Sequence, residues 1–371
     1  MFSKQSIDNI ERLVWQQAEN LSANMASIDK DKASVDLLQA FRSFALDTIM
    51  AFTFGFNVST LASHNFQDPL VIALNSSLSS MPFMKHFPSI RKIAYAIPPS
   101  IGMNMMPGGD KLVARIYQVS GILKEQLQKI LIAPEKLDEA PHQTIFHRLL
   151  DKTAYKTGRL PDITEFMDEG MTLLTAGAHT VADTLVVGAW HLTQQPDLVD
   201  ELREEIKTVW PNLPSVPSAN ELKQLPLLSA TVKEMLRMGP MGVSFTRIVP
   251  QEGAIIAGRA IPGGTVVGMG INHVHLSETI FKDAKTFNPR RWMGTDSSGL
   301  DQWLVAFSKG PRACIGVNLA MMELNIATAM VIRRFTLSND GTTEADMEWK
   351  ECFAAFFPRR HLHAWCKPVS E

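Results

Sequence analysis

Apolar residues recur at helical spacing through much of the chain. Near the start they predict an amphipathic helix over residues 7 to about 25, with these positions on one face: Ile7, Ile10, Leu13, Val14, Ala18 and Leu21. Residues 35–55 are apolar on most sides, which predicts a buried helix. That helix should end near Gly55, because glycine readily adopts the left-handed conformation of a helix C-cap.

The longest helical segment follows Asp162. Asp162 can accept hydrogen bonds from the first N–H groups of a helix, and Glu165 stands where a capping box has its second carboxylate. No proline follows until Pro196. At about 1.5 Å per residue this helix should extend roughly 45–50 Å and cross a domain. Shorter helices are expected over residues 111–132, 197–210 and 225–238.

The pattern changes after residue 243. Short apolar runs up to residue 269 are separated by glycine and proline, a composition typical of strands and turns. The sequence contains no internal repeat, low-complexity stretch or clear boundary. We therefore predict a mainly α chain with a small β part, forming a single domain over residues 1–371.

Residues 61–109 are rich in methionine, proline and phenylalanine. Proline interrupts long helices, while methionine and phenylalanine provide adaptable apolar surface. Such a surface could line a substrate channel or make peripheral contact with a membrane. Ordinary core packing explains the same composition equally well.

Composition limits the kinds of partner. The chain has 371 residues, of which 45% are hydrophobic and 20% charged, and its net charge is −2. Nucleic acid is therefore not an expected partner. Cys314, Cys352 and Cys366 form no C-x-x-C pair and no disulfide framework, which indicates a reducing, intracellular compartment. The polar first residues show neither a secretory signal nor a membrane anchor.

The candidate chemistry lies in the loop over residues 307–316. Gly310 and Gly316 allow the backbone to bend tightly around a bound group. Cys314 stands just before a predicted helix, whose unpaired N–H groups should lower the pKa of its thiol and favour a metal-binding thiolate. Arg312 adds positive charge nearby. A lone cysteine between glycines is often only a small buried residue. The surrounding residues therefore have to distinguish a metal-binding thiolate from an ordinary buried cysteine.

Five positions of this loop match a known signature. Phe307, Gly310, Arg312, Cys314 and Gly316 reproduce F-x-x-G-x-R-x-C-x-G, and the chain thereby resembles the cytochrome P450 family of haem-thiolate monooxygenases. The resemblance implies that haem b binds in this loop, with Cys314 as the axial ligand of its iron. It also implies electrons from NADPH through a separate reductase, since the chain has no flavin or dinucleotide fingerprint.

A second family motif is E-x-x-R, formed by Glu234 and Arg237. Alone, such a pair is usually a solvated surface ion pair of little energetic value. In the family, however, it joins a later arginine, and Arg291 in the F-N-P-R-R-W segment matches that position. The resemblance implies that the three residues form a structural network that braces the cysteine loop.

The resemblance also implies donors for the two haem propionates. Arg247, Arg312 and His275 match positions that bind propionates in the family, although each could be an ordinary surface charge. Apolar candidates for the substrate pocket suggest a lipophilic small molecule: Leu173, Leu174, Met241, Val243 and Phe245. The loop and the F-N-P-R-R-W segment look most like those of fungal members in secondary metabolism.

On the long helix, residues 176–180 match the oxygen-binding motif A-G-x-(acid)-T of the family. The match implies that Gly177 leaves room for dioxygen and that Thr180 supplies a hydroxyl that passes protons. His179 replaces the usual acid. A histidine that titrates near neutral pH could still relay protons, and a core histidine without such a role is an equal alternative.

The family parts that normally come first have no match here. They are a membrane anchor, the first strands, a loop over the substrate, and a helix whose Trp and Arg hold a propionate. We therefore expect an N-terminally truncated domain with exposed apolar surface, whose full-length relatives lie at the endoplasmic reticulum surface. The leading hypothesis is a monooxygenase. The alternatives are a haem enzyme for rearrangement or peroxide-type chemistry, and a non-catalytic remnant.

Overall fold

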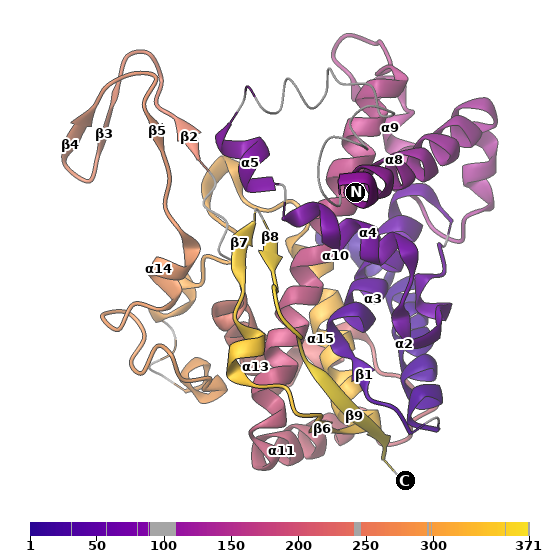
Figure 1. The fold of residues 1–371 in the computed structure, drawn as a ribbon, viewed down its shortest axis with the longest axis vertical. Coiled ribbons are helices and arrows are strands. Elements are labelled where there is room, and N and C mark those ends of the chain that lie inside the picture. Colours follow the sequence, from indigo (N-terminus) through magenta and orange to yellow (C-terminus); the bar gives the residue numbers. More distant parts are fainter. Residues whose placement is uncertain are drawn as a thin grey trace.

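A computed structural model describes residues 1–30, 32–56, 58–79, 81–87, 89, 109–240, 246–294, 297, 299–352 and 354–369. It is mainly helical with small sheets, which confirms the predicted fold class (Figure 1). The helices are α1 Lys4–Asp8, α2 Glu11–Lys30, α3 Leu37–Phe54, α4 Pro69–Leu78, α5 Met81–His86, α8 Gly109–Ile132, α9 Ile145–Leu149, α10 Ile163–Thr193, α11 Pro196–Lys207, α12 Ala219–Gln224, α13 Pro226–Met238, α14 Ile271–His275 and α15 Val317–Arg334.

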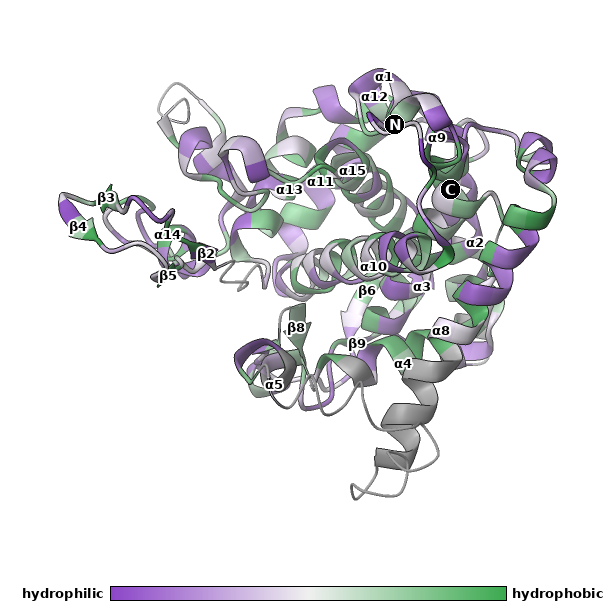
Figure 2. Cartoon of the chain, turned by 90° about the horizontal axis from the view of Figure 1, so that it is seen from above, coloured by the Kyte–Doolittle hydropathy of each residue, from purple (hydrophilic) through white to green (hydrophobic). Residues whose placement is uncertain are grey.

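The long helix α10 runs through the middle of the helical body (Figures 1 and 2). Its predicted start is confirmed, because Asp162 accepts from the N–H groups of Thr164 and Glu165 while the Glu165 carboxylate accepts from the Asp162 N–H. It packs most extensively against α3. A buried ion pair joins the two helices, with Nη2 of Arg42 3.0 Å from Oδ1 of Asp183.

The helix α3 ends as predicted. Gly55 has φ +78° in the left-handed region, and its N–H donates to the Ala51 carbonyl. Its start differs from the expectation, because residues 35 and 36 pair as a strand before the helix begins. The predicted first helix is also divided into α1 and α2 by a turn at Asn9 and Ile10. Both differences lie at element ends, where hydrophobic spacing alone does not set the boundary.

Within the described residues, the strands form one three-stranded sheet and three two-stranded sheets. The three-stranded sheet has the antiparallel order β1-β9-β6, so a strand near the start of the chain pairs with one near its end. The remaining pairs are β2 with β5, β3 with β4, and β7 with β8. The strands are β1 Val35–Asp36, β2 Arg247–Ile248, β3 Ala254–Ile256, β4 Arg259–Ile261, β5 Val266–Val267, β6 Phe335–Asn339, β7 Lys350–Cys352, β8 Ala354–Phe356 and β9 His363–Pro368.

The strands β2 to β5 form an arm that extends away from the helical body, next to α14 (Figures 1 and 2). These are the strands predicted from the glycine-rich stretch after residue 243. Several apolar side chains of this arm are exposed: Ile248, Ile255, Ile256, Val266 and Met269. Apolar surface of this kind usually marks a place where something else packs.

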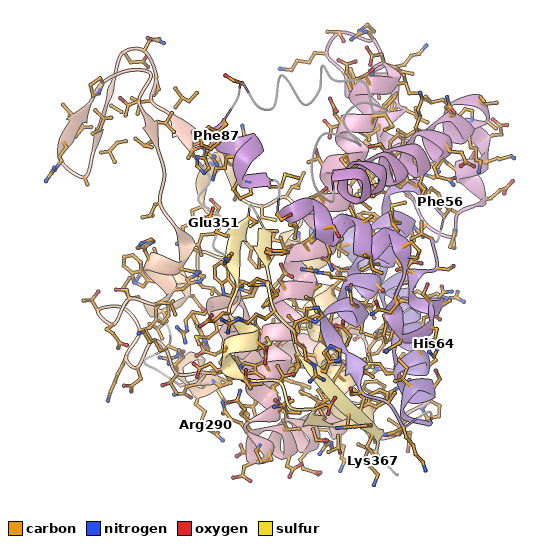
Figure 3. The ribbon with its side chains drawn as sticks, viewed as in Figure 1. Phe56, His64, Phe87, Arg290, Glu351 and Lys367 are labelled. Atoms are coloured by element: carbon orange, nitrogen blue, oxygen red, sulfur yellow. The ribbon has the colours of Figure 1, made fainter. Side chains whose placement is uncertain are left out.

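Part of the methionine-rich stretch is described as α4 and α5. The helix α5 lies beside β7, where Nζ of Lys85 is 3.8 Å from a carboxylate oxygen of Glu351 (Figure 3). Residues 90–108 lie outside the described part of the chain. Among the helices that are described, none has the length and apolar character needed to cross a membrane.

Candidate haem-thiolate site

Cys314 lies at the end of the predicted loop, directly before α15. Its N–H donates to the Phe307 carbonyl at 2.8 Å, which closes the loop across its base. Gly310 has φ +74°, a conformation that few residues other than glycine adopt, and it opens a short 3-10 turn that ends at Arg312. The thiol side chain is exposed. The sequence therefore builds a narrow loop that presents one sulfur at the start of a helix.

The pKa of the Cys314 thiol differs from the expectation. Partial desolvation by the surrounding loop raises this pKa above its usual value, and the Gly316 N–H beside the sulfur lowers it by less. The prediction that the helix start makes the free thiol acidic is wrong for this structure. Deprotonation of Cys314 would therefore have to be favoured by the metal that it binds.

The three residues of the second motif are in direct contact. The Glu234 carboxylate receives two hydrogen bonds from Arg237, at 2.7 and 2.8 Å, and one from Nε of Arg291 at 3.0 Å. Arg237 and Glu234 are fully buried. Burial alone would raise the pKa of Glu234, but the hydrogen bonds and charge of Arg237, followed by the Asn288 N–H and Arg291, lower it below its usual value. Glu234 is thus a buried, ionised centre of the network.

A fourth side chain completes this network. Nε1 of Trp292 donates to the Glu234 carboxylate at 2.8 Å. Sequence reasoning did not assign Trp292 a role, although it directly follows Arg291 in the F-N-P-R-R-W segment. The role could have been inferred because a buried carboxylate such as Glu234 needs several hydrogen-bond donors, and the indole N–H of Trp292, next to Arg291, is a suitable one.

The network reaches the cysteine loop through His275. Nη1 of Arg237 donates to the His275 carbonyl at 2.8 Å, and Nε2 of His275 accepts from the Val305 N–H at 2.9 Å. Val305 in turn accepts from the Ser308 N–H at 2.8 Å, at the entry to the loop. Arg237 and Val305 are thereby connected through one residue, by the carbonyl of His275 on one side and its imidazole on the other.

The role of His275 as a propionate donor stays a prediction. The residue is fully buried, and burial, with a smaller effect of Arg237, lowers the pKa of its imidazole to about 4. With Nε2 accepting from Val305, the neutral ring carries its proton on Nδ1, which has no hydrogen-bond partner among the described residues. His275 also holds the backbone that leads into the loop.

The two predicted propionate donors with guanidinium groups are exposed. Arg312 lies in the cysteine loop and Arg247 in β2, and neither is buried in the helical body. Nη1 of Arg247 donates to the Thr246 carbonyl at 2.9 Å. Their role as partners of the two propionates stays a prediction.

On α10, Gly177 and Ala176 have different surroundings. A Cβ atom added to Gly177 would lie 2.7 Å from Cγ1 of Ile49 on α3, so this glycine allows the two helices to pack closely. Ala176 is exposed. The expectation that Gly177 borders an open space for dioxygen is therefore wrong in this structure. Ala176 faces solvent on the same helix, one turn before Thr180.

Thr180 is half-buried and its hydroxyl donates to the Ala176 carbonyl at 3.0 Å. Such a bond from a threonine to the carbonyl four residues earlier competes with the helical hydrogen bond and can bend a helix. The hydroxyl oxygen can still accept a hydrogen bond. Thr180 therefore keeps the geometry that a proton-passing hydroxyl needs.

His179 is enclosed in the core. Its Nδ1 lies 3.2 Å from the Thr175 carbonyl, while its Nε2 is buried without a hydrogen-bond partner in the described part of the chain. Burial, together with the charge of Arg42, lowers the pKa of the imidazole to about 3. The expectation that it titrates near neutral pH is wrong for this structure. Any relay through His179 would use a neutral ring.

Two predicted pocket residues are described. Leu173 is half-buried and Leu174 is part of the core. Met241, Val243 and Phe245 lie outside the described residues.

The chemistry of these donors fits a haem group. An exposed thiol in a glycine-containing loop offers one axial ligand, and two exposed arginines offer cationic partners for two carboxylates. The helices α10 and α15 pack against each other, so the proximal loop and the oxygen-side motif belong to adjacent helices (Figure 2). A mainly helical fold with this cysteine loop and a buried Glu-Arg-Arg network defines a haem-thiolate protein.

The family assignment agrees. A family model described as Cytochrome P450 matches residues 1–360. The chain therefore belongs to the cytochrome P450 family, and the resemblance identified from the sequence is confirmed.

Several curated relatives are similar over most of the chain. "Cytochrome P450 monooxygenase penB" of Penicillium thymicola is 32% identical over 346 residues, which cover 93% of this chain and 76% of the relative. "Cytochrome P450 monooxygenase macH" of Penicillium terrestre is 31% identical and covers 95% of this chain and 69% of the relative. "Cytochrome P450 monooxygenase flvC" of Aspergillus flavus is 31% identical, with 98% and 67% coverage.

Proposed function

We propose that this chain is a haem-dependent monooxygenase that inserts one oxygen atom of dioxygen into a lipophilic small molecule in fungal secondary metabolism. The observation that carries the proposal is the exposed Cys314 in a loop supported by a buried, ionised Glu234. Similarity to fungal proteins named as monooxygenases supports the reaction type. The apolar pocket candidates identified from the sequence, which include Leu173 and Leu174 on α10, support a lipophilic substrate.

The proximal side of the site is assigned to the cysteine loop. Cys314 would hold the iron, while Phe307, Gly310 and Gly316 would shape the surface beneath the ring. Arg312 and Arg247 would hold the propionates by charge-assisted hydrogen bonds. The haem group, when bound, supplies the activation of dioxygen. The protein supplies its position and the exclusion of competing ligands.

The distal side is assigned to α10. The Thr180 hydroxyl donates to the Ala176 carbonyl, and its oxygen can at the same time accept a hydrogen bond from a water molecule. His179 would act from the core behind it, by fixing the helix through Thr175 and presenting a neutral ring. Electrons would come from NADPH through a separate reductase, because the sequence has no dinucleotide-binding fingerprint.

A second candidate function follows from His179. Because burial lowers the pKa of this imidazole to about 3, it does not replace the missing carboxylic acid as a proton donor at neutral pH. A haem enzyme that rearranges its substrate, or uses a peroxide, has less need of protons delivered from solvent. This observation favours rearrangement or peroxide-type chemistry as the alternative to oxygen insertion.

The proposal is tested by reductase-supported turnover. Purified protein with haem is mixed with a fungal reductase and NADPH, and NADPH oxidation, oxygen uptake and hydrogen peroxide release are recorded. The monooxygenase proposal predicts NADPH-dependent oxygen uptake that changes in rate or peroxide yield in Thr180→Ala. The control is Thr193→Ala, because its hydroxyl also donates to a carbonyl of α10, at 2.8 Å, but at the far end of the helix.

The two candidates give different results in this assay. Equal turnover and equal peroxide yield in the wild-type protein and Thr180→Ala would contradict the monooxygenase proposal. Substrate conversion that needs no reductase, or that runs with added peroxide alone, would support the second candidate.

A further inference from the structure

Three side chains of types that can bind metal ions lie together at the end of the three-stranded sheet where β1 ends and β9 begins. They are Asp36 at the end of β1, His361, and His363 at the start of β9. One donor atom from each residue can be chosen so that all lie within 4.8 Å of one another. None of these residues has a role in the proposed haem chemistry.

The sheet pairing brings the three residues together. Asp36 and His363 are direct partners in the antiparallel register of β1 and β9 (Figure 1). His361 precedes His363 by two residues, the spacing that places side chains on the same face of an extended segment. Their two rings stack with centroids 5.8 Å apart and an angle of 11° between planes. The cluster is therefore fixed by backbone pairing between distant parts of the chain.

The distances suit a bound metal ion. Nδ1 of His361 lies 3.0 Å from Oδ1 of Asp36, and Nε2 of His363 lies 3.9 Å from Oδ2 of the same carboxylate. Donors that each lie about 2.0–2.2 Å from a tetrahedral zinc ion are about 3.3–3.6 Å apart. The two observed distances run to different oxygens of Asp36, and one donor atom from each of the three residues lies within 4.8 Å of the others. Side-chain rotations would therefore be needed to bring all three donors to the zinc separation.

The two oxygens of Asp36 have separate tasks. Oδ1 accepts from the Gln39 N–H at 3.1 Å and caps the start of α3. Oδ2 lies on the side of His363. The carboxylate is buried, whereas the side chains of His361 and His363 keep 18% and 25% of their surface exposed. An ion held here would thus have a rigid carboxylate on one side and access to water on the other.

We propose that Asp36, His361 and His363 form a binding site for a divalent transition-metal ion of the zinc class, with water at the remaining position. Two imidazoles and one carboxylate are a ligand set for zinc and related ions, and not for magnesium or calcium, which prefer oxygen. The ion links the cap of α3 to the C-terminal strand. Since α3 packs against α10, metal binding stabilises the part of the fold that carries the oxygen-side motif.

The test is calorimetric titration of zinc into the tag-free full chain, with magnesium as the comparison ion. The expected result is one zinc ion per chain with no magnesium binding, and a rise of the melting temperature with zinc. His363→Ala should weaken zinc binding at least tenfold and remove the rise. His273→Ala is the matched control, because His273 is an exposed histidine outside the cluster, and it should bind zinc normally.

Two further measurements distinguish zinc bound at this cluster from zinc bound elsewhere on the chain. The titrations are repeated in a Cys314→Ala background, since an exposed thiol can also bind zinc. Cobalt substitution should give the visible absorption bands of a tetrahedral site, lost in both His361→Ala and His363→Ala. The absence of zinc binding, or zinc binding that survives both histidine substitutions, would overturn the proposal and leave a simple ion pair between Asp36 and His361.

Discussion

Nε2 of His275 accepts a hydrogen bond from the Val305 N–H at 2.9 Å, and this bond joins the buried arginine network to the segment that enters the cysteine loop. Arg237 fixes the other side of His275 through its carbonyl. The loop is therefore held by a side chain that is neither part of the E-x-x-R motif nor in the loop itself. The position of Cys314 depends on this connection.

We expect His275→Phe to loosen the loop. The substitution leaves the Val305 N–H without its acceptor, at a cost of about 1–3 kcal/mol. Hydrogen exchange should become faster at Val305 and over the following loop residues. The control is His273→Phe, two residues earlier on the same short helix and exposed. If hydrogen exchange over this segment is as slow in His275→Phe as in the wild-type protein, the hydrogen bond between His275 and Val305 does not stabilise the loop.

Arg237→Lys should destabilise the protein strongly. Arg237 makes two hydrogen bonds to Glu234 and further bonds to the carbonyls of His275 and Thr286, which a single ammonium cannot reproduce. Loss of a partner from a fully buried ion pair costs roughly 3–5 kcal/mol. The measurement is urea unfolding. Arg290→Lys is the control, because its pair with Glu201 is exposed and such pairs contribute about 0–1 kcal/mol.

Gly177→Ala should disturb the contact between α10 and α3. The new Cβ would lie 2.7 Å from Ile49, and overpacking of this kind costs about 1–3 kcal/mol. Ile49→Ala in the same chain should relieve much of the strain, so the two changes should be strongly non-additive in a double-mutant cycle. Ala176→Ser is the exposed control. Additive effects of the two changes would contradict the contact.

Stability should rise as the pH increases from about 4 to 6.5. Burial lowers the pKa of His179 to about 3, and the pKa values of His191 and His275 to about 4. In this window the unfolded chain binds protons that the folded chain does not, so each histidine adds up to about 1.4 kcal/mol per pH unit. Asp183 opposes this below pH 6, because burial raises its pKa to about 6 despite Arg42.

The pH effect is measured by urea unfolding at several pH values. His179→Gln should reduce the slope of stability against pH by about one proton between pH 4.5 and 5.5, where the unfolded imidazole is protonated and the folded one is neutral. Asp183 is present in both proteins, so its own contribution does not enter this difference. His273→Gln, at an exposed position, should leave the slope unchanged. An unchanged slope in His179→Gln would show that this histidine titrates alike in the folded and unfolded chain.

The sequence predicts what depends on local chemistry. The cap at Asp162, the end of α3 at Gly55 and the Glu234–Arg237 spacing follow from contacts within a few residues, or from a motif with a known later partner. Hydrophobic spacing could not predict the pairing of β1 with β9, because it depends on residues more than 300 positions apart in the chain. The burial of individual titratable side chains could not be predicted from the sequence either. The pKa values of His179 and Cys314 differ from expectation because of desolvation, which adds to the effect of Arg42 at His179 and outweighs the Gly316 N–H at Cys314.

The most direct test of the central claim is a carbon-monoxide difference spectrum of the purified, reduced protein after haem loading. The account predicts the red-shifted Soret band of a thiolate-ligated haem, and its loss in Cys314→Ala. Cys352→Ala, which removes a buried cysteine outside the loop, should keep the band. Failure of the wild-type chain to take up haem, or a thiolate-type band that persists in Cys314→Ala, would contradict the assignment of Cys314 as the iron ligand.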